Sequence, residues 1–174
     1  ARKEIENKRL EAKKEIEKKR LEAKKEIETK RSELKEKVKI IKDEKKKEIV
    51  TKLADKFNDS NKKMTDRLGE ATEKLENVLE KIESKTNEVE SRGGNVAEVR
   101  ASIAGAKQAI VDLRGAILTQ AAKVYAATFA SESTLGGDLK IVRETLRNDL
   151  EALKATYKKA HEAVGDAAKA LARS

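Results

Sequence analysis

Apolar residues recur every three or four positions along most of the chain, a spacing that predicts long amphipathic helices. The spacing is sustained over residues 50–89, 96–124 and 139–171. It is broken most clearly at Arg92-Gly93-Gly94-Asn95, where a glycine can end one helix and Asn95 can cap the next. A second break, Ser131–Thr134, is typical of a helix start.

The pattern therefore predicts an all-α protein. We expect one very long N-terminal helix that continues into an up-down-up antiparallel three-helix bundle of coiled-coil type, because helices of similar length joined by short turns become antiparallel neighbours. The first helix should run without interruption, since no proline occurs and the first glycine is Gly69. The predicted parts are a charged helical stalk at 1–48 and a bundle at 49–174, whose helices span about 49–91, 95–129 and 134–172.

The stalk contains an eleven-residue repeat. Residues 3–13, 14–24 and 25–35 read KEIENKRLEAK, KEIEKKRLEAK and KEIETKRSELK. Eleven residues make three helical turns of 3.67 residues, so equivalent positions stay on one line of the helix. We call the resulting apolar line the stalk stripe: Ile5, Ala12, Ile16, Ala23, Ile27 and Leu34. Leu10 and Leu21 form a second, thinner line about 140° away.

Three interpretations of the stalk compete. Glutamates precede lysines by four residues and arginines by three in every repeat, and such pairs stabilise a helix that has little packing. The stalk could therefore be a rigid spacer. It could also be a basic arm for an acidic polymer, or an assembly element whose stalk stripe packs on a neighbouring subunit. We favour assembly, because the regular stripe is expected to have no partner within its own chain.

Composition argues against an enzyme. The 174 residues include no cysteine and a single histidine, His161, which excludes disulfides, thiol nucleophiles and multi-histidine metal sites. Aromatic residues make up 2% of the chain, whereas ligand pockets are usually rich in them. We find no phosphate-binding loop and no nucleophile motif. The sequence therefore predicts no catalytic residue, no metal and no cofactor.

The charge is +9 and is concentrated in residues 1–48, where 20 Lys/Arg face 13 Asp/Glu. A basic helix can bind nucleic acid, but here acids interrupt every turn and aromatic stacking residues are missing, which disfavours that partner. No apolar run approaches the roughly 20 residues that span a bilayer, which disfavours membrane insertion.

Several stretches are similar to an uncharacterised group of secreted, Lys/Glu-rich helical proteins of candidate-phylum bacteria. They are residues 43–50 (DEKKKEIV), 53–56 (LADK), 61–67 (NKKMTDR) and 142–150 (VRETLRNDL). The resemblance covers residues 36–174 and implies export, so we expect an extracellular or cell-surface location, with the cytoplasm as the alternative. It also implies a short extended segment between the last two helices, whereas residues 125–131 of this chain read as more helical.

The sequence thus leads to a functional hypothesis. We expect a non-enzymatic structural protein, the subunit of a helical homopolymer such as a cell-surface filament, that assembles with itself through the stalk stripe. A head-to-tail contact that does not close would produce an open filament. The alternative is a helical binding module that carries a rigid or polyanion-binding basic arm.

Overall fold

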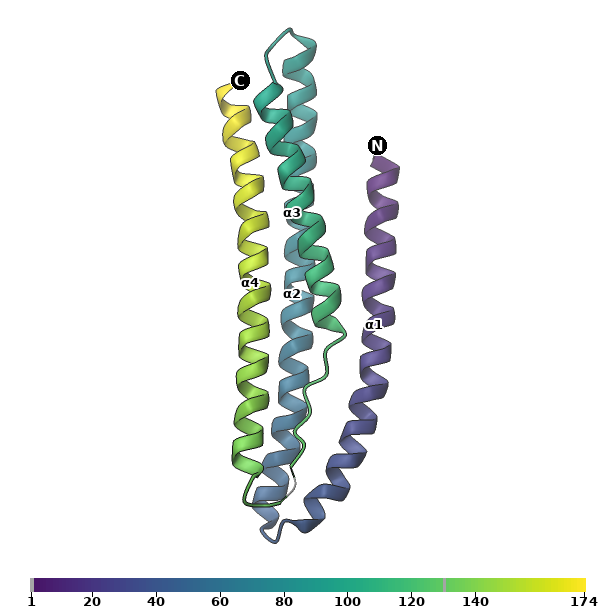
Figure 1. Cartoon of the computed structure of the whole chain (residues 1–174). Coiled ribbons are helices and arrows are strands. Elements are labelled where there is room, and N and C mark those ends of the chain that lie inside the picture. The colour runs from purple at the N-terminus through teal and green to yellow at the C-terminus, as the bar shows by residue number, and fades with distance from the viewer. Residues whose placement is uncertain (1, 130) are drawn as a thin grey trace. The chain divides into compact units, whose positions relative to one another are not determined.

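The computed structural model describes residues 2–129 and 131–174, and among these the side chains of all but residues 2–5 and 8. Over this part the chain is all-helical, with four α-helices and no strand (Figure 1). The elements are α1 (Arg2–Lys37), a 3₁₀ turn η1 (Val38–Ile40), α2 (Glu44–Ser91), α3 (Ala97–Ala121) and α4 (Leu135–Arg173). The prediction of an all-α fold is confirmed.

The first helix is interrupted, and the prediction of one continuous helix is wrong. Helix α1 ends at Lys37, and Ile41 adopts an extended conformation with φ −78° and ψ 125°. Two causes act together. Val38 and Ile41 are buried at the bend. The Asp43 carboxylate accepts hydrogen bonds from the backbone N–H groups of Lys45 and Lys46, at 2.9 and 3.3 Å, and so caps α2. Neither cause involves a glycine or a proline.

The chain forms two compact units. Unit 1 comprises residues 1–65 and 118–151, and unit 2 comprises residues 66–117 and 152–174. Helices α2 and α4 therefore each contribute to both units. This division differs from the predicted boundary at residue 48.

Unit 1 has a core to which α1 itself contributes. One apolar cluster joins the bend, α2 and the start of α4: Leu34, Val38, Ile41, Val50, Phe129 and Leu135. A second one lies between α2, the segment that follows α3, and α4: Phe57, Tyr125 and Leu146. Because Leu34 of α1 belongs to this core, the prediction that the stalk at 1–48 is separate from the bundle is wrong at this residue.

Unit 2 is a three-helix arrangement of α3 with parts of α2 and α4. Its core includes Val99, Leu113 and Ala160, each with 1% exposure or less. Ion pairs of 2.7 Å join Arg114 to Glu76 and Lys107 to Glu83. The two partners on α3 and the two on α2 are each seven residues apart but in opposite order, so α2 and α3 are antiparallel, as predicted.

The turn predicted at Gly93-Gly94-Asn95 is confirmed. Gly93 has φ +84°, which favours glycine, and the Gly94 N–H donates to the carbonyl of Val89 at 3.0 Å. The side-chain oxygen of Asn95 accepts a hydrogen bond from the Ala97 N–H at 3.2 Å, at the start of α3.

The helix predicted over 95–129 is shorter than expected. Helix α3 ends at Ala121, and no helix spans the described residues 122–129. The interpretation of residues 125–131 as helical is therefore wrong for residues 125–129, while Ala130 lies outside the described residues. Helix α4 begins at Leu135, one residue from its predicted start.

Candidate assembly interface

The stalk stripe lies on the face of α1 that its own chain covers. Ala23 and Leu34 are buried, with exposures of 6% and 5%. The other described members are half-buried: Ala12, Ile16 and Ile27. The side chain of Ile5 lies outside the described residues. Leu34 packs in a core cluster with Val50 of α2, so the expectation that the stripe has no partner within its own chain is wrong at this residue.

The arginines of the repeat align α1 along α2 within unit 1. The Arg31 guanidinium donates to the Asp55 carboxylate at 2.9 Å, and Arg20, one repeat earlier, donates to the Thr65 hydroxyl at 3.4 Å. The two donors are eleven residues apart and their acceptors ten residues apart in the opposite order. Helix α1 therefore runs antiparallel to the first part of α2. The eleven-residue period of the repeat differs by one residue from the spacing between the acceptors Asp55 and Thr65.

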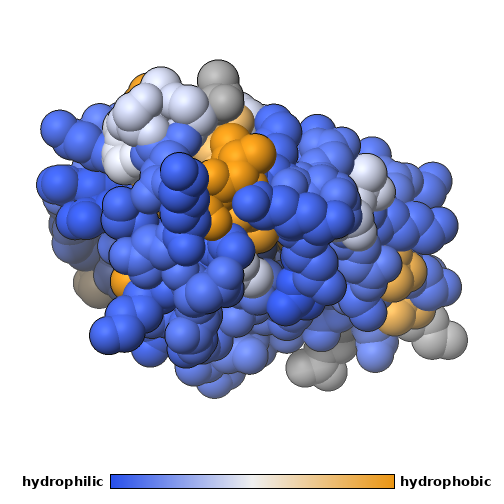
Figure 2. Space-filling view, turned by 90° about the horizontal axis from the view of Figure 1, so that it is seen from below, coloured by the Kyte–Doolittle hydropathy of each residue, from blue (hydrophilic) through white to orange (hydrophobic). Residues whose placement is uncertain are grey.

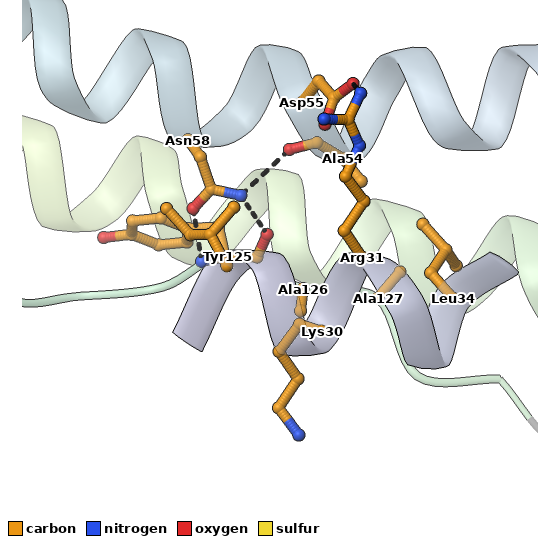
Figure 3. Close-up of a pocket in the computed structure, with 10 residues that line it drawn as sticks. Lys30, Arg31, Leu34, Ala54, Asp55, Asn58, Tyr125, Ala126 and Ala127 are labelled. Atoms are coloured by element: carbon orange, nitrogen blue, oxygen red, sulfur yellow. Dashed lines mark hydrogen bonds and ion pairs between the residues drawn. The ribbon is translucent and has the colours of Figure 1, made fainter. Parts of the chain in front are cut away.

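A shallow pocket marks the place where α1, α2 and the segment after α3 meet (Figure 3). Ile27, Arg31 and Leu34 line it from α1, while Ala54 and Asn58 line it from α2. In Figure 3 Arg31 extends toward Asp55, whereas Lys30 points away from the pocket. Small side chains, such as Ala54 and the alanines at 126 and 127, leave α1 incompletely packed at this point.

The segment 122–129 is held by amide side chains of α2. Asn58 donates to the carbonyl of Tyr125 at 2.9 Å and accepts from its N–H at 2.9 Å, which replaces the hydrogen bonds that a helix would provide. Asn61 donates to the carbonyls of Gln120 and Lys123 at 3.0 and 3.2 Å. These carbonyls belong to the end of α3 and the residues just beyond it, so α2 fixes the point at which α3 stops.

A largely buried polar network continues from this segment to α4. The Tyr125 hydroxyl donates to the Asp149 carboxylate at 2.6 Å and accepts from the Gln120 amide at 2.6 Å. Lys123 forms an ion pair of 2.7 Å with the same carboxylate. Gln120 also donates to the side-chain oxygen of Asn61 at 2.8 Å. The network therefore links α2, the end of α3 and α4 within unit 1.

The electrostatics of the network favour a neutral tyrosine and a charged aspartate. Burial, together with the hydrogen bond to Asp149, raises the pKa of Tyr125 far above its ordinary value. Partial burial acts to raise the pKa of Asp149, but the hydrogen bonds and the positive charge supplied by Lys123 and Tyr125 outweigh it, and the pKa is lowered. The network is thus stable as a phenol–carboxylate–ammonium arrangement.

Sequence reasoning missed this network because helical periodicity is read from apolar residues. Asn61 and Thr65 are polar residues of α2 that are buried nevertheless. A usable signal was present: Asn58 and Asn61 are three residues apart on α2, and such amides compete for backbone groups of neighbouring segments. The sequence also contained a signal for the bend. Asp43, a residue type that caps helices, follows the apolar residues Val38, Ile40 and Ile41, which lie outside the repeat.

The single histidine of the sequence, His161, lies on α4. His161 is exposed, with its ring centroid 6.1 Å from that of Tyr157. Among the described residues, no group of three or more His, Cys, Asp or Glu side chains is placed to hold a metal ion. No helix within this range is both long and apolar enough to cross a membrane.

Comparisons with known proteins add no relative: no protein-family model, no curated protein and no solved structure matches this chain.

Proposed function

We propose that the protein is a non-enzymatic structural protein that assembles with copies of itself, through α1, into a helical homopolymer. One observation carries the proposal: two members of the stalk stripe lie against α2 and the segment 122–129, with Leu34 buried in the cluster that Val50 and Phe129 share and Ile27 lining a pocket with Ala54 and Ala127. Every copy of the chain has both the stripe and the surface that receives it. Self-association therefore requires no further binding site.

The ion pair between Arg31 of α1 and Asp55 of α2 is exposed, and exposed ion pairs contribute at most about 1 kcal/mol. Leu34, by contrast, is buried in a core cluster with Val50. Association through α1 should therefore depend on the apolar stalk stripe more than on this ion pair. The cell-surface setting of the polymer is part of the proposal and rests on the resemblance to secreted helical proteins.

Point variants of the full chain test the proposal. Ile16→Asp and Ile27→Asp place charges in the stalk stripe and should abolish polymers in light scattering and negative-stain microscopy. The matched control carries Leu10→Asp and Leu21→Asp on the same repeats, where the side chains are 52% and 54% exposed. Polymers should persist in the control. A wild-type chain that stays monomeric at high protein concentration, in low and high salt, would overturn the proposal.

A second candidate function is binding of an acidic polymer by the basic arm. Unit 1 contains 28 Lys/Arg against 20 Asp/Glu, whereas unit 2 contains 13 against 12. The excess of eight positive charges is thus confined to the unit that contains α1. Fluorescence anisotropy with labelled heparin or single-stranded DNA distinguishes this function, because binding to a polyanion weakens steeply with salt. Packing of the stalk stripe should persist in high salt.

A further inference from the structure

The bend between α1 and α2 consists of residues that could all continue a helix. Residues 38–43 read VKIIKD and include neither glycine nor proline, and neither occurs between Arg2 and Leu68. Ile41 has an extended conformation, and a short 3₁₀ turn precedes it. The bend is therefore imposed by burial of Val38 and Ile41 and by the Asp43 cap, and not by the conformational preferences of its residues.

We propose that α1 is exchanged between two copies of the chain. In the exchanged form the bend straightens into helix, and α1 continues into α2 as one rod. The stalk stripe of each copy then occupies, on the other copy, the place on α2 and the segment 122–129 that its own α1 occupies in this structure. The contacts of the stalk stripe are the same in both states, so the exchange conserves this interface and alters the connection, where Val38 and Ile41 change their surroundings.

The partner is a second copy because the occupant is already defined. The antiparallel match of Arg20 and Arg31 to Thr65 and Asp55 specifies a surface for this helix. Short connections that bend without a flexible residue favour exchange, since straightening them relieves the constraint. Exchange between two copies closes a two-fold dimer in which the two rods run antiparallel and cross at the former bends, whereas exchange passed from each copy to the next builds the open homopolymer.

Exposed apolar side chains at the bend agree with such a crossing. Ile49, on the first turns of α2, is 56% exposed. Figure 2 looks at the end of the molecule where α1 turns into α2 and shows apolar surface among mostly hydrophilic atoms. In a continuous helix, Val38, Ile41 and Ile49 lie within about 80° of one another and form an apolar face at the point where the two rods would meet.

Lys42→Pro and its matched control Lys42→Ala test the exchange. Proline at 42 is compatible with the bend, because Ile41 already has the extended conformation that a residue before proline adopts, and its cost there is the long hydrogen bond of 3.4 Å from the Lys42 N–H to Glu132. It cannot lie inside a continuous helix, so it should weaken exchange by about a hundredfold for each helix. Alanine removes the same side chain and permits the helix. Size-exclusion chromatography with light scattering should find Lys42→Pro monomeric and Lys42→Ala associated, as dimers or as polymers, both with helical circular dichroism.

A deletion of residues 39–42 tests the inference from the opposite direction. The shortened connection prevents α1 from folding back, so the chain should be dimeric at all concentrations. Lys42→Pro dimers equal to those of Lys42→Ala, or a folded monomeric deletion chain, would overturn the exchange.

The inference rests on the proposed function in taking α1 as the associating element, and the two can fail separately. Dimers that respond to Lys42→Pro without forming polymers support the exchange and refute the homopolymer. Polymers that form equally in Lys42→Pro and Lys42→Ala support the homopolymer and refute the exchange.

Discussion

The Tyr125 hydroxyl lies 2.6 Å from the Asp149 carboxylate and joins a non-helical segment to the first part of α4. The same oxygen accepts from Gln120 at the end of α3. One phenol thus connects two helices that the chain itself joins only through residues 122–134.

Tyr125→Phe should lower the free energy of unfolding by about 1–3 kcal/mol, because it leaves the polar groups of Gln120 and Asp149 without the hydroxyl that both contact. Urea denaturation followed by circular dichroism measures the change. Tyr157→Phe is the matched control, since Tyr157 is half-buried on α4 and outside the network. The control should change stability by less than about 0.5 kcal/mol. Equal effects of the two variants would contradict a role for the network.

Alkaline pH should remove the contribution of Tyr125. Its pKa in the folded state lies above the ordinary value of 10.0, so folding favours the protonated phenol. The contribution is complete below pH 10.0 and is lost as the pH rises beyond it. The difference in unfolding free energy between wild type and Tyr125→Phe should therefore shrink above this pH. Titration of the lysines affects wild type and Tyr125→Phe alike, so it cancels in this difference. A difference that stays constant into the alkaline range would refute the assignment.

The docking of α1 should depend on apolar burial more than on charge. Leu34→Ala removes a side chain of the core cluster and should cost about 2–5 kcal/mol. Arg31→Ala breaks an exposed ion pair with Asp55 and should cost less than about 1 kcal/mol. Hydrogen exchange on the full chain is the measurement: amides of α1 should exchange much faster in Leu34→Ala than in Arg31→Ala. The reverse order would show that charge holds the helix.

Two glycines should respond to alanine with opposite signs. Gly93→Ala places a side chain at φ +84°, in the left-handed region, and should destabilise unit 2 by about 1 kcal/mol. Gly105→Ala lies inside α3, where a Cβ atom meets nothing within 4 Å, and should stabilise the protein by about 0.5–1 kcal/mol. Thermal unfolding of both variants checks the pair. A stabilising Gly93→Ala would contradict the helix end described at this turn.

Features determined by local sequence could be predicted. Helical periodicity identified nearly all the helical residues, and the glycine pair with Asn95 located the turn between α2 and α3. The stalk stripe was also recognised as a face that needs to be covered. Each of these depends on residues close together in the chain, and local preferences are read directly from sequence.

Features determined by distant residues could not be predicted in the same way. The bend at Val38 and Ile41 exists because Val50, Phe129 and Leu135 bury it, and no local breaker marks it. Helix α3 stops at Ala121, where the amide of Asn61 on α2, roughly 60 residues earlier, binds the carbonyls of Gln120 and Lys123. In both places tertiary packing overrides helix propensity, which is a weak preference for each residue.

The amides of Asn58 and Asn61 also have a consequence for the order of folding. They bind backbone groups 59 to 67 residues away, so the segment 122–129 can be set in place only after a long stretch of chain has been enclosed. Helices, by contrast, close through neighbours four residues apart and form quickly. The slowest step in refolding of this helical protein should therefore be the docking of the segment 122–129.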